Sequence, residues 1–298
     1  MTQSIYRGRF APSPTGELHF GTLLAAVGSY LQARSHQGEW LMRIEDVDTT
    51  RCVPGAADAL LRALDGFGFE WQGEVVYQSQ RTELYESALD NLSKKNLIYP
   101  CTCSRKQLAN EDNLSLPVYA GHCRHHHLPL AEEHALRVRV EDRTISFEDQ
   151  IMGQNRQQLA SECGDFVIKR KDGLFAYQLA VVVDDAQQGV TEVVRGVDLL
   201  NSTPRQIYLQ QQLGYVQPNY LHLPLLIDLQ GHKLGKSTGA AALNLSQPVL
   251  HLHSVLVLLG QQPPAELTRD SLSQLWLWAI EHWNIENIPK QNQFIKHQ

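Results

Sequence analysis

Short apolar segments alternate with helical patterns over the first hundred residues, and this alternation restricts the fold more than any other feature of the chain. Strand-like and helix-like segments follow one another at residues 4–10, 18–34, 40–44, 54–67 and 82–95. Strands that alternate with helices of this length are typical of a parallel sheet covered by helices. The sequence therefore predicts an α/β fold.

The first strand and the first helix are joined by a loop that is rich in proline and glycine. Residues 11–16 contain two prolines and a glycine, which prevent regular structure there. His19, Gly21 and Thr22 follow at the start of the helix, where free N–H groups and the positive end of the helix dipole suit a phosphate. Gly21 would let a nucleotide approach the backbone, and His19 can donate to a phosphate oxygen.

A second segment suited to phosphate lies far along the chain. Residues 233–237 read Lys-Leu-Gly-Lys-Ser, so Lys233 and Lys236 stand with a hydroxyl group on a glycine-containing loop. Two ammonium groups suit the negative charge of a phosphoryl transition state. Each segment is weak evidence by itself, because a histidine at a helix start is usually a cap and a lysine-rich loop is usually solvated.

The two segments gain weight from their neighbours. In chain order, residues 9–19, 43–48, 194–206 and 233–237 resemble the signature segments of the class I glutamyl-tRNA synthetases. The resemblance covers about the first 240 residues. It implies a class I synthetase-type Rossmann nucleotide-binding fold that uses ATP with Mg²⁺ to form an aminoacyl-adenylate. Two positions depart from the family: Thr22 stands where a second histidine is common, and Gly235 stands where serine is common.

The amino acid implied by this resemblance is L-glutamate. A dicarboxylic substrate needs a cation for its side-chain carboxylate and an anion for its ammonium group. Arg9 and Arg195 are the candidate cations, and Glu45 is the candidate anion. The alternative is that Arg9 and Glu45 simply pair with each other on adjacent strand ends. The glutamate-binding residues that we expect are Arg9, Ala11, Ser13, Glu45, Tyr177 and Arg195.

A group of cysteines and histidines interrupts the α/β pattern. Cys101, Cys103 and Cys123 lie within 23 residues of a loop-rich segment, which favours a structural zinc site with three sulfur ligands. By ligand chemistry alone, one of the histidines at positions 122 and 125–127 is the better fourth ligand, because a phenol has a pKa near 10. However, the pattern resembles the zinc knuckle of a truncated glutamyl-tRNA synthetase paralogue, and this resemblance implies Tyr119 as the fourth ligand.

The remaining sequence completes the expected domain organisation. The continuously apolar residues 179–183 predict a buried parallel strand, and residues 203–213, 250–259 and 271–283 predict helices. The C-terminal tryptophans could stack on RNA, although helical spacing favours the core. We expect two halves of the Rossmann domain, a zinc-bearing insertion between them, and a small helical subdomain after them, with boundaries at 1–98, 99–176, 177–230 and 231–298.

Composition limits where the protein acts. No apolar run approaches the roughly 20 residues that a membrane span needs, and we see no apolar leader. With five cysteines in 298 residues and no export signal, we expect a reducing cytoplasm. We also expect a monomer. The net charge of −6 means that a nucleic acid must meet a local positive face.

The C-terminal end bears on the acceptor of the glutamate. Only 62 residues follow Lys236, which is too few for the anticodon-binding domains of a glutamyl-tRNA synthetase. The chain is thus similar to a truncated paralogue, and this resemblance implies tRNA-independent activation of glutamate and transfer to the queuosine base at the wobble position of tRNA(Asp). The alternatives are an ordinary glutamyl-tRNA synthetase acting without an anticodon domain and an inactive tRNA-binding module.

Overall fold

The computed structural model describes residues 5–104, 118–126, 128–129, 133–228 and 243–294. Its first part alternates strands and helices as predicted, and the elements lie close to the expected bounds. These are β1 (Arg7–Phe10), α1 (Phe20–Ser35), β2 (Glu39–Ile44), α2 (Ala56–Gly66) and α3 (Thr82–Lys94). The short strand β3 (Val76–Tyr77), between α2 and α3, was not predicted.

The central sheet has the strand order of a nucleotide-binding fold. β1 pairs in parallel with β2, and β2 with β3, while β9 (Glu192–Gly196) pairs in parallel with β10 (Asn219–Leu223). β1 and β9 lie side by side, and the amide of Thr191 donates to the carbonyl of Arg7 over 2.9 Å. In the order β3-β2-β1-β9-β10, successive strands are added to one side of β1 in the first half of the chain and to the other side in the second half. Open α/β sheets form their binding crevice at such a switch point, here between β1 and β9.

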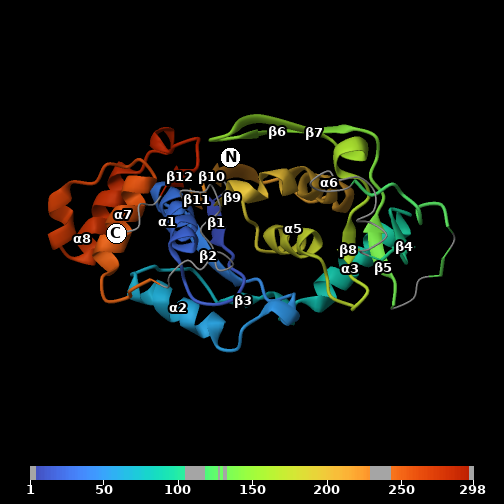
Figure 1. Cartoon of the computed structure of the whole chain (residues 1–298), viewed down its shortest axis with the longest axis horizontal. Coiled ribbons are helices and arrows are strands. Elements are labelled where there is room, and N and C mark those ends of the chain that lie inside the picture. Colours follow the sequence, from blue (N-terminus) through green and yellow to red (C-terminus); the bar gives the residue numbers. More distant parts are fainter. Residues whose placement is uncertain (1–4, 105–117, 127, 130–132, 229–242, 295–298) are drawn as a thin grey trace.

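Helix α1 lies between this sheet and the C-terminal helices (Figure 1). Leu23 and Leu31 are fully buried, and α1 packs against β1 and β9 as well as α7 (Pro248–Leu258) and α8 (Leu272–His282). Because it has neighbours on opposite sides, α1 is apolar nearly all round. One hydrophobic core therefore contains side chains of both the sheet and the C-terminal helices.

The segment between the two halves of the sheet forms two structures. β4 (Ile98–Cys101), β5 (Ala135–Val138) and β8 (Val167–Lys169) form a small antiparallel sheet. A hairpin of β6 (Thr144–Asp149) and β7 (Gly153–Gln158) instead joins the central sheet, where Asp149 of β6 pairs with Tyr220 of β10. The sequence analysis did not predict this hairpin, although alternate residues of β6 are buried, as is typical of a strand with one covered face.

The apolar run at residues 179–183 is a helix, so the predicted strand is wrong. It lies within α5 (Tyr177–Gln187), which packs against α3 and α6 (Thr203–Leu213). Every side chain from Leu179 to Val183 is at most 1% exposed. A short run that is buried all round does not distinguish a strand from a helix, and here the helix is the observed structure.

The C-terminal helices confirm the predicted helical segments. Trp276 is 7% exposed, and its Nε1 donates to the carbonyl of Phe67 over 2.8 Å. Its ring lies edge-on to Tyr30 and Phe69, so Trp276 belongs to the core, as its spacing indicated. Across the described ranges, no helix is both long enough and apolar enough to cross a membrane.

Candidate active site

A cleft of about 970 Å³ opens where β1 and β9 end. The loop after β1, the start of α1 and the end of β9 form its walls, as the strand order predicts. Lys233 and Lys236 were also expected at this site, but they lie outside the described residues. All the other residues that we predicted for ATP and glutamate line the cleft: Arg9, Ala11, Ser13, His19, Gly21, Thr22, Glu45, Tyr177 and Arg195.

One end of the cleft is the N-terminus of α1. His19 is the N-cap residue, and its Nδ1 accepts the amide N–H of Thr22 over 3.3 Å. The other ring nitrogen, Nε2, then carries the proton and lies 2.9 Å from the hydroxyl of Thr22. The first turn of α1 contains no acidic residue, so the positive end of the helix dipole faces the cleft without a side-chain anion of its own.

The two candidate cations come from neighbouring strands. Arg9 is 4% exposed, and its Nε lies 3.1 Å from the Asp185 carboxylate, while one terminal nitrogen donates to the carbonyl of Val194. Arg195 is 5% exposed and donates to Gln206 over 2.8 Å and to the Tyr177 hydroxyl over 3.4 Å. Both guanidinium groups are thus held by the protein at the wall of the cleft.

The candidate anion, Glu45, does not pair with Arg9. Its side chain is 8% exposed and lies 3.4 Å from a terminal nitrogen of Arg43, while the partner of Arg9 is Asp185. The alternative of a direct Arg9–Glu45 pair is therefore wrong. Burial raises the pKa of Glu45 to about 7, and the positive charges of Arg43 and Arg9 lower it only in part.

A buried charge network behind the cleft was missed by the sequence analysis. Arg43 is fully buried and contacts Asp185 at 2.7 Å, Glu45 at 3.4 Å and Asp184 at 3.9 Å. Asp184 also accepts hydrogen bonds from Tyr85 and, over 2.6 Å, from Arg81. The two aspartates directly follow the apolar run of α5, and this position was the available signal that they lie inside the fold.

The three predicted cysteine ligands lie together at the end of β4. The sulfur atoms of Cys101, Cys103 and Cys123 all lie within 4.8 Å of one another, and the group could hold a metal ion. The Tyr119 hydroxyl lies 3.5 Å from two of these sulfurs, those of Cys101 and Cys103. A tetrahedral zinc ion, with Zn–S bonds of about 2.3 Å, separates its ligand atoms by similar distances. The donor set therefore fits zinc chemistry.

The histidine alternative for the fourth ligand has less support from this geometry. The group that could hold a metal contains no histidine among the described residues, which include His122, His125 and His126. His127 lies outside them. The His122 ring is edge-on to the Tyr119 ring, with 6.2 Å between the centroids. Tyr119 as a ligand remains a prediction.

The surroundings act differently on two of the cysteines: burial raises the pKa of the Cys103 thiol, whereas the pKa of the Cys123 thiol is lowered. Burial alone would raise the pKa of the Cys123 thiol, but hydrogen bonds from the Thr102 backbone and from Tyr119 and Cys103 lower it to about 6. Arg137 lies over the Tyr119 ring, 3.8 Å from its centroid, and its Nε donates to the Cys101 sulfur over 3.3 Å. A fixed positive charge thus lies beside a group that becomes negative when it binds a metal.

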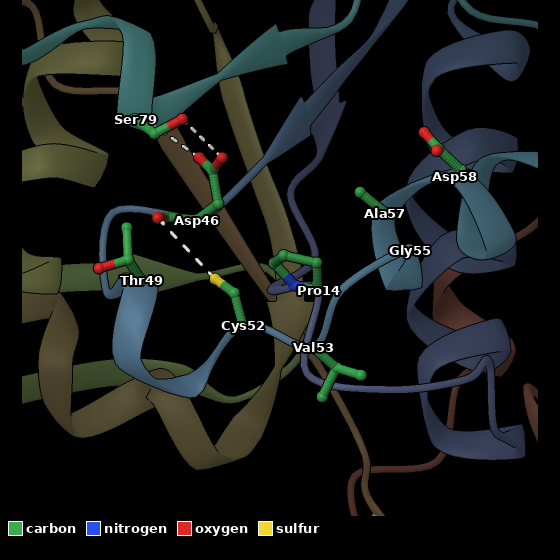
Figure 2. A pocket seen from close by; sticks show the side chains of 9 residues that line it. All are labelled: Pro14, Asp46, Thr49, Cys52, Val53, Gly55, Ala57, Asp58 and Ser79. Atoms are coloured by element: carbon green, nitrogen blue, oxygen red, sulfur yellow. Dashed lines mark hydrogen bonds between the residues drawn. The ribbon is translucent and has the colours of Figure 1, made fainter.

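A smaller pocket of about 240 Å³ adjoins the segment 43–48 (Figure 2). The Asp46 carboxylate points to Ser79 and accepts its amide over 2.8 Å and its hydroxyl over 2.6 Å. The Cys52 thiol points to the carbonyl of Asp46, which is 3.9 Å away. These groups hold the loop itself in place, and none of the predicted site residues lines this pocket.

Comparison with known proteins identifies the class to which this fold and cleft belong. Residues 6–267 match the family model of the tRNA synthetases class I (E and Q), catalytic domain. The chain therefore belongs to this family of class I tRNA synthetases. This result confirms the resemblance on which the expected nucleotide-binding fold and site were based.

Individual relatives narrow the comparison. The chain is 53% identical over 294 residues to a glutamyl-Q tRNA(Asp) synthetase of Dechloromonas aromatica, and 50% identical over 291 residues to one of Chromobacterium violaceum. Each alignment covers 97% of both chains. A crystal structure of the glutamate-tRNA synthetase of Elizabethkingia anophelis superposes with a TM-score of 0.82 at 24% identity, covering 98% of this chain and 68% of that one, and supports the fold.

Proposed function

We propose that the protein activates L-glutamate with ATP in the absence of tRNA and transfers it to the queuosine base at the wobble position of tRNA(Asp). The observation that carries the proposal is that one cleft, between the ends of β1 and β9, contains His19, Arg9, Arg195 and Glu45. The names of relatives that are 50–53% identical over nearly the whole chain support the acceptor.

The cleft supplies the groups that activation requires. The glutamate α-carboxylate is ionised at neutral pH, attacks the α-phosphorus of ATP and displaces pyrophosphate, so no general base is needed. His19 and the start of α1 would hold phosphate oxygens, together with Lys233 and Lys236. Mg²⁺ bound with ATP would neutralise part of the phosphate charge. Arg9 and Arg195 would bind the side-chain carboxylate, and Glu45 the ammonium group.

The remaining parts have supporting roles in this proposal. Cys101, Cys103, Tyr119 and Cys123 would hold one structural Zn²⁺ and fix the insertion at residues 99–176. Residues 1–98 and 177–230 would form the two halves of the catalytic domain, followed by the small helical subdomain. We further propose that the enzyme acts as a monomer in the cytoplasm, where charged tRNA is used.

Two assays test this function directly. The first measures glutamate-dependent exchange of pyrophosphate into ATP with and without tRNA, and we expect exchange in both cases. The second measures transfer of labelled glutamate to tRNA(Asp) that lacks only queuosine and to tRNA(Asp) that lacks only its 3′-terminal adenosine. We expect the first tRNA to accept no glutamate and the second to accept it normally.

The other outcomes favour the alternatives. Exchange that requires tRNA, with transfer lost when the 3′ adenosine is removed, would indicate an ordinary glutamyl-tRNA synthetase. No exchange under any condition would indicate a tRNA-binding module without activity. A further control replaces glutamate with glutamine, which lacks the charge that Arg9 and Arg195 would bind and should be activated poorly.

The raised pKa of Glu45 leads to a pH-dependent affinity for glutamate. An ammonium ligand favours the carboxylate form, so below a pKa of about 7 the ligand must displace a proton. We expect the KM for glutamate to rise about five- to tenfold between about pH 7.5 and pH 6. The exchange assay measures this change. Glu45→Gln should bind glutamate more weakly throughout and lose the dependence; an equally steep profile in that variant would assign it to another group.

A further inference from the structure

Three buried side chains form a line of contacts behind the glutamate end of the cleft. The His222 Nδ1 lies 2.6 Å from the Asp149 carboxylate, and both side chains are fully buried. On its other side, the His222 Nε2 lies 3.0 Å from the Nε of Arg195, which lines the cleft. These contacts connect β6, β10 and β9 in that order.

The proton positions in this line are fixed by chemistry. A guanidinium group can only donate, so the His222 Nε2 must accept, and the ring proton must be on Nδ1. The Asp149 carboxylate receives that proton's hydrogen bond. Asp149 is held in turn by the backbone amides of Met152 at 2.8 Å and Ile151 at 3.1 Å. Burial also lowers the pKa of His222, which favours the neutral ring.

The orientation of Arg195 depends on this acceptor. Its two terminal nitrogens donate to Gln206 and to the Thr203 hydroxyl, each over 2.8 Å. His222 is the partner of the third nitrogen, Nε, and with Gln206 and Thr203 it fixes the in-plane rotation of the guanidinium group. Without an acceptor there, a buried charged donor would lose its hydrogen bond, and only the contacts of the two terminal nitrogens would hold the guanidinium group.

We propose that His222 is a positioning residue for glutamate binding, which acts by holding Arg195 in the rotation that receives a substrate carboxylate, with Asp149 selecting the tautomer that can do so. This inference rests on the proposed function. It also gives the β6–β7 hairpin a role, because the hairpin carries Asp149 and thereby connects the inserted segment to the amino-acid pocket.

Three substitutions of His222 separate positioning from simple packing. Glutamine places an oxygen near the position of the histidine Nε2, so His222→Gln keeps an acceptor for Arg195. Asparagine reaches only the Nδ1 position, so His222→Asn keeps the Asp149 contact alone, and His222→Leu keeps neither. In the pyrophosphate-exchange assay we expect His222→Asn and His222→Leu to raise the KM for glutamate about tenfold or more. The KM for ATP and the kcat at saturating glutamate should change little, and His222→Gln should bring the glutamate KM most of the way back.

The inference fails if the folded asparagine and leucine variants keep the parent KM for glutamate, or if all three variants lose glutamate and ATP binding alike. A second readout does not need activity. In ¹⁵N-labelled protein, the Nε–H resonance of Arg195 should be protected from solvent exchange and lose that protection in His222→Leu but not in His222→Gln. This result would hold even if the parent showed no exchange with glutamate, whereas an unprotected resonance in the parent would contradict the inference alone.

Discussion

Replacement of Arg43 by methionine should lower the free energy of unfolding by about 3–5 kcal/mol. Arg43 is fully buried between Glu45, Asp184 and Asp185. Methionine fills much of the same volume but leaves three carboxylates near one another without the central cation. The loss therefore reflects unpaired buried charge rather than a cavity. Urea unfolding near pH 7.5 measures the change.

Arg7, which forms an ion pair nearer the surface, provides the control. Arg7 contacts Glu39 at 2.6 Å, but both side chains are about one-third exposed (33% and 34%), so Arg7→Met should cost less than about 1 kcal/mol. At acidic pH, the difference in the free energy of unfolding between Arg43→Met and the parent should also become smaller. Although burial alone would raise it, the pKa of Asp185 is lowered because Arg9 and Arg43 favour its charged form. That pairing stabilises the fold above the pKa of the unfolded chain and is lost as the pH falls. Equal losses for the two arginines would contradict this account.

Replacement of Cys101 by serine should reduce the zinc content from about one ion per chain to none. Cys101 is buried and shares the Tyr119 hydroxyl with Cys103, so its loss removes a central ligand of the proposed site. Elemental analysis of freshly prepared protein gives the metal content. We expect transfer to tRNA to fall much more than pyrophosphate exchange, because the site lies in the insertion and the cleft lies at the central sheet.

Cys52→Ser is the appropriate comparison for this variant. Cys52 is a free cysteine outside the metal-binding group, and its thiol contacts only backbone carbonyls among the hydrogen bonds of its loop. Its replacement should leave the zinc content unchanged. Parent protein without metal, or an equal loss of zinc in both variants, would refute the assignment.

The local patterns of the sequence predicted much of the fold, and the structure brings most of the candidate site residues to one cleft. Loop composition and helical spacing located α1 and the loop before it, because those features depend on neighbouring residues. The partners of Arg9 and Arg43 were not predictable in this way. Asp185 lies well over a hundred residues away in sequence, and only the tertiary placement of α5, which carries it, brings it to them.

The same limit explains the errors in the middle of the chain. The run at residues 179–183 has no polar face, so its period could not reveal a helix. The attachment of the β6–β7 hairpin to β10 was not predictable from local patterns, because it joins segments about seventy residues apart. The hairpin itself pairs neighbouring segments, and the alternation in β6 was the available signal for it. The predicted cysteine site, by contrast, depended on spacing within one short segment, and the structure brings those sulfurs together.

The position of α1 between the central sheet and helices α7 and α8 affects how the protein unfolds and whether its C-terminal part can be exchanged for that of another protein. Trp276 and Leu256 belong to the same buried cluster as Leu31 and Trp40. Removing the C-terminal helices would expose a broad apolar face of the nucleotide-binding part to water. The C-terminal helices should therefore not fold or unfold separately: they and the part that contains the cleft should unfold in one cooperative transition. A chimaera joined between the two parts would need a replacement that covers the same apolar face.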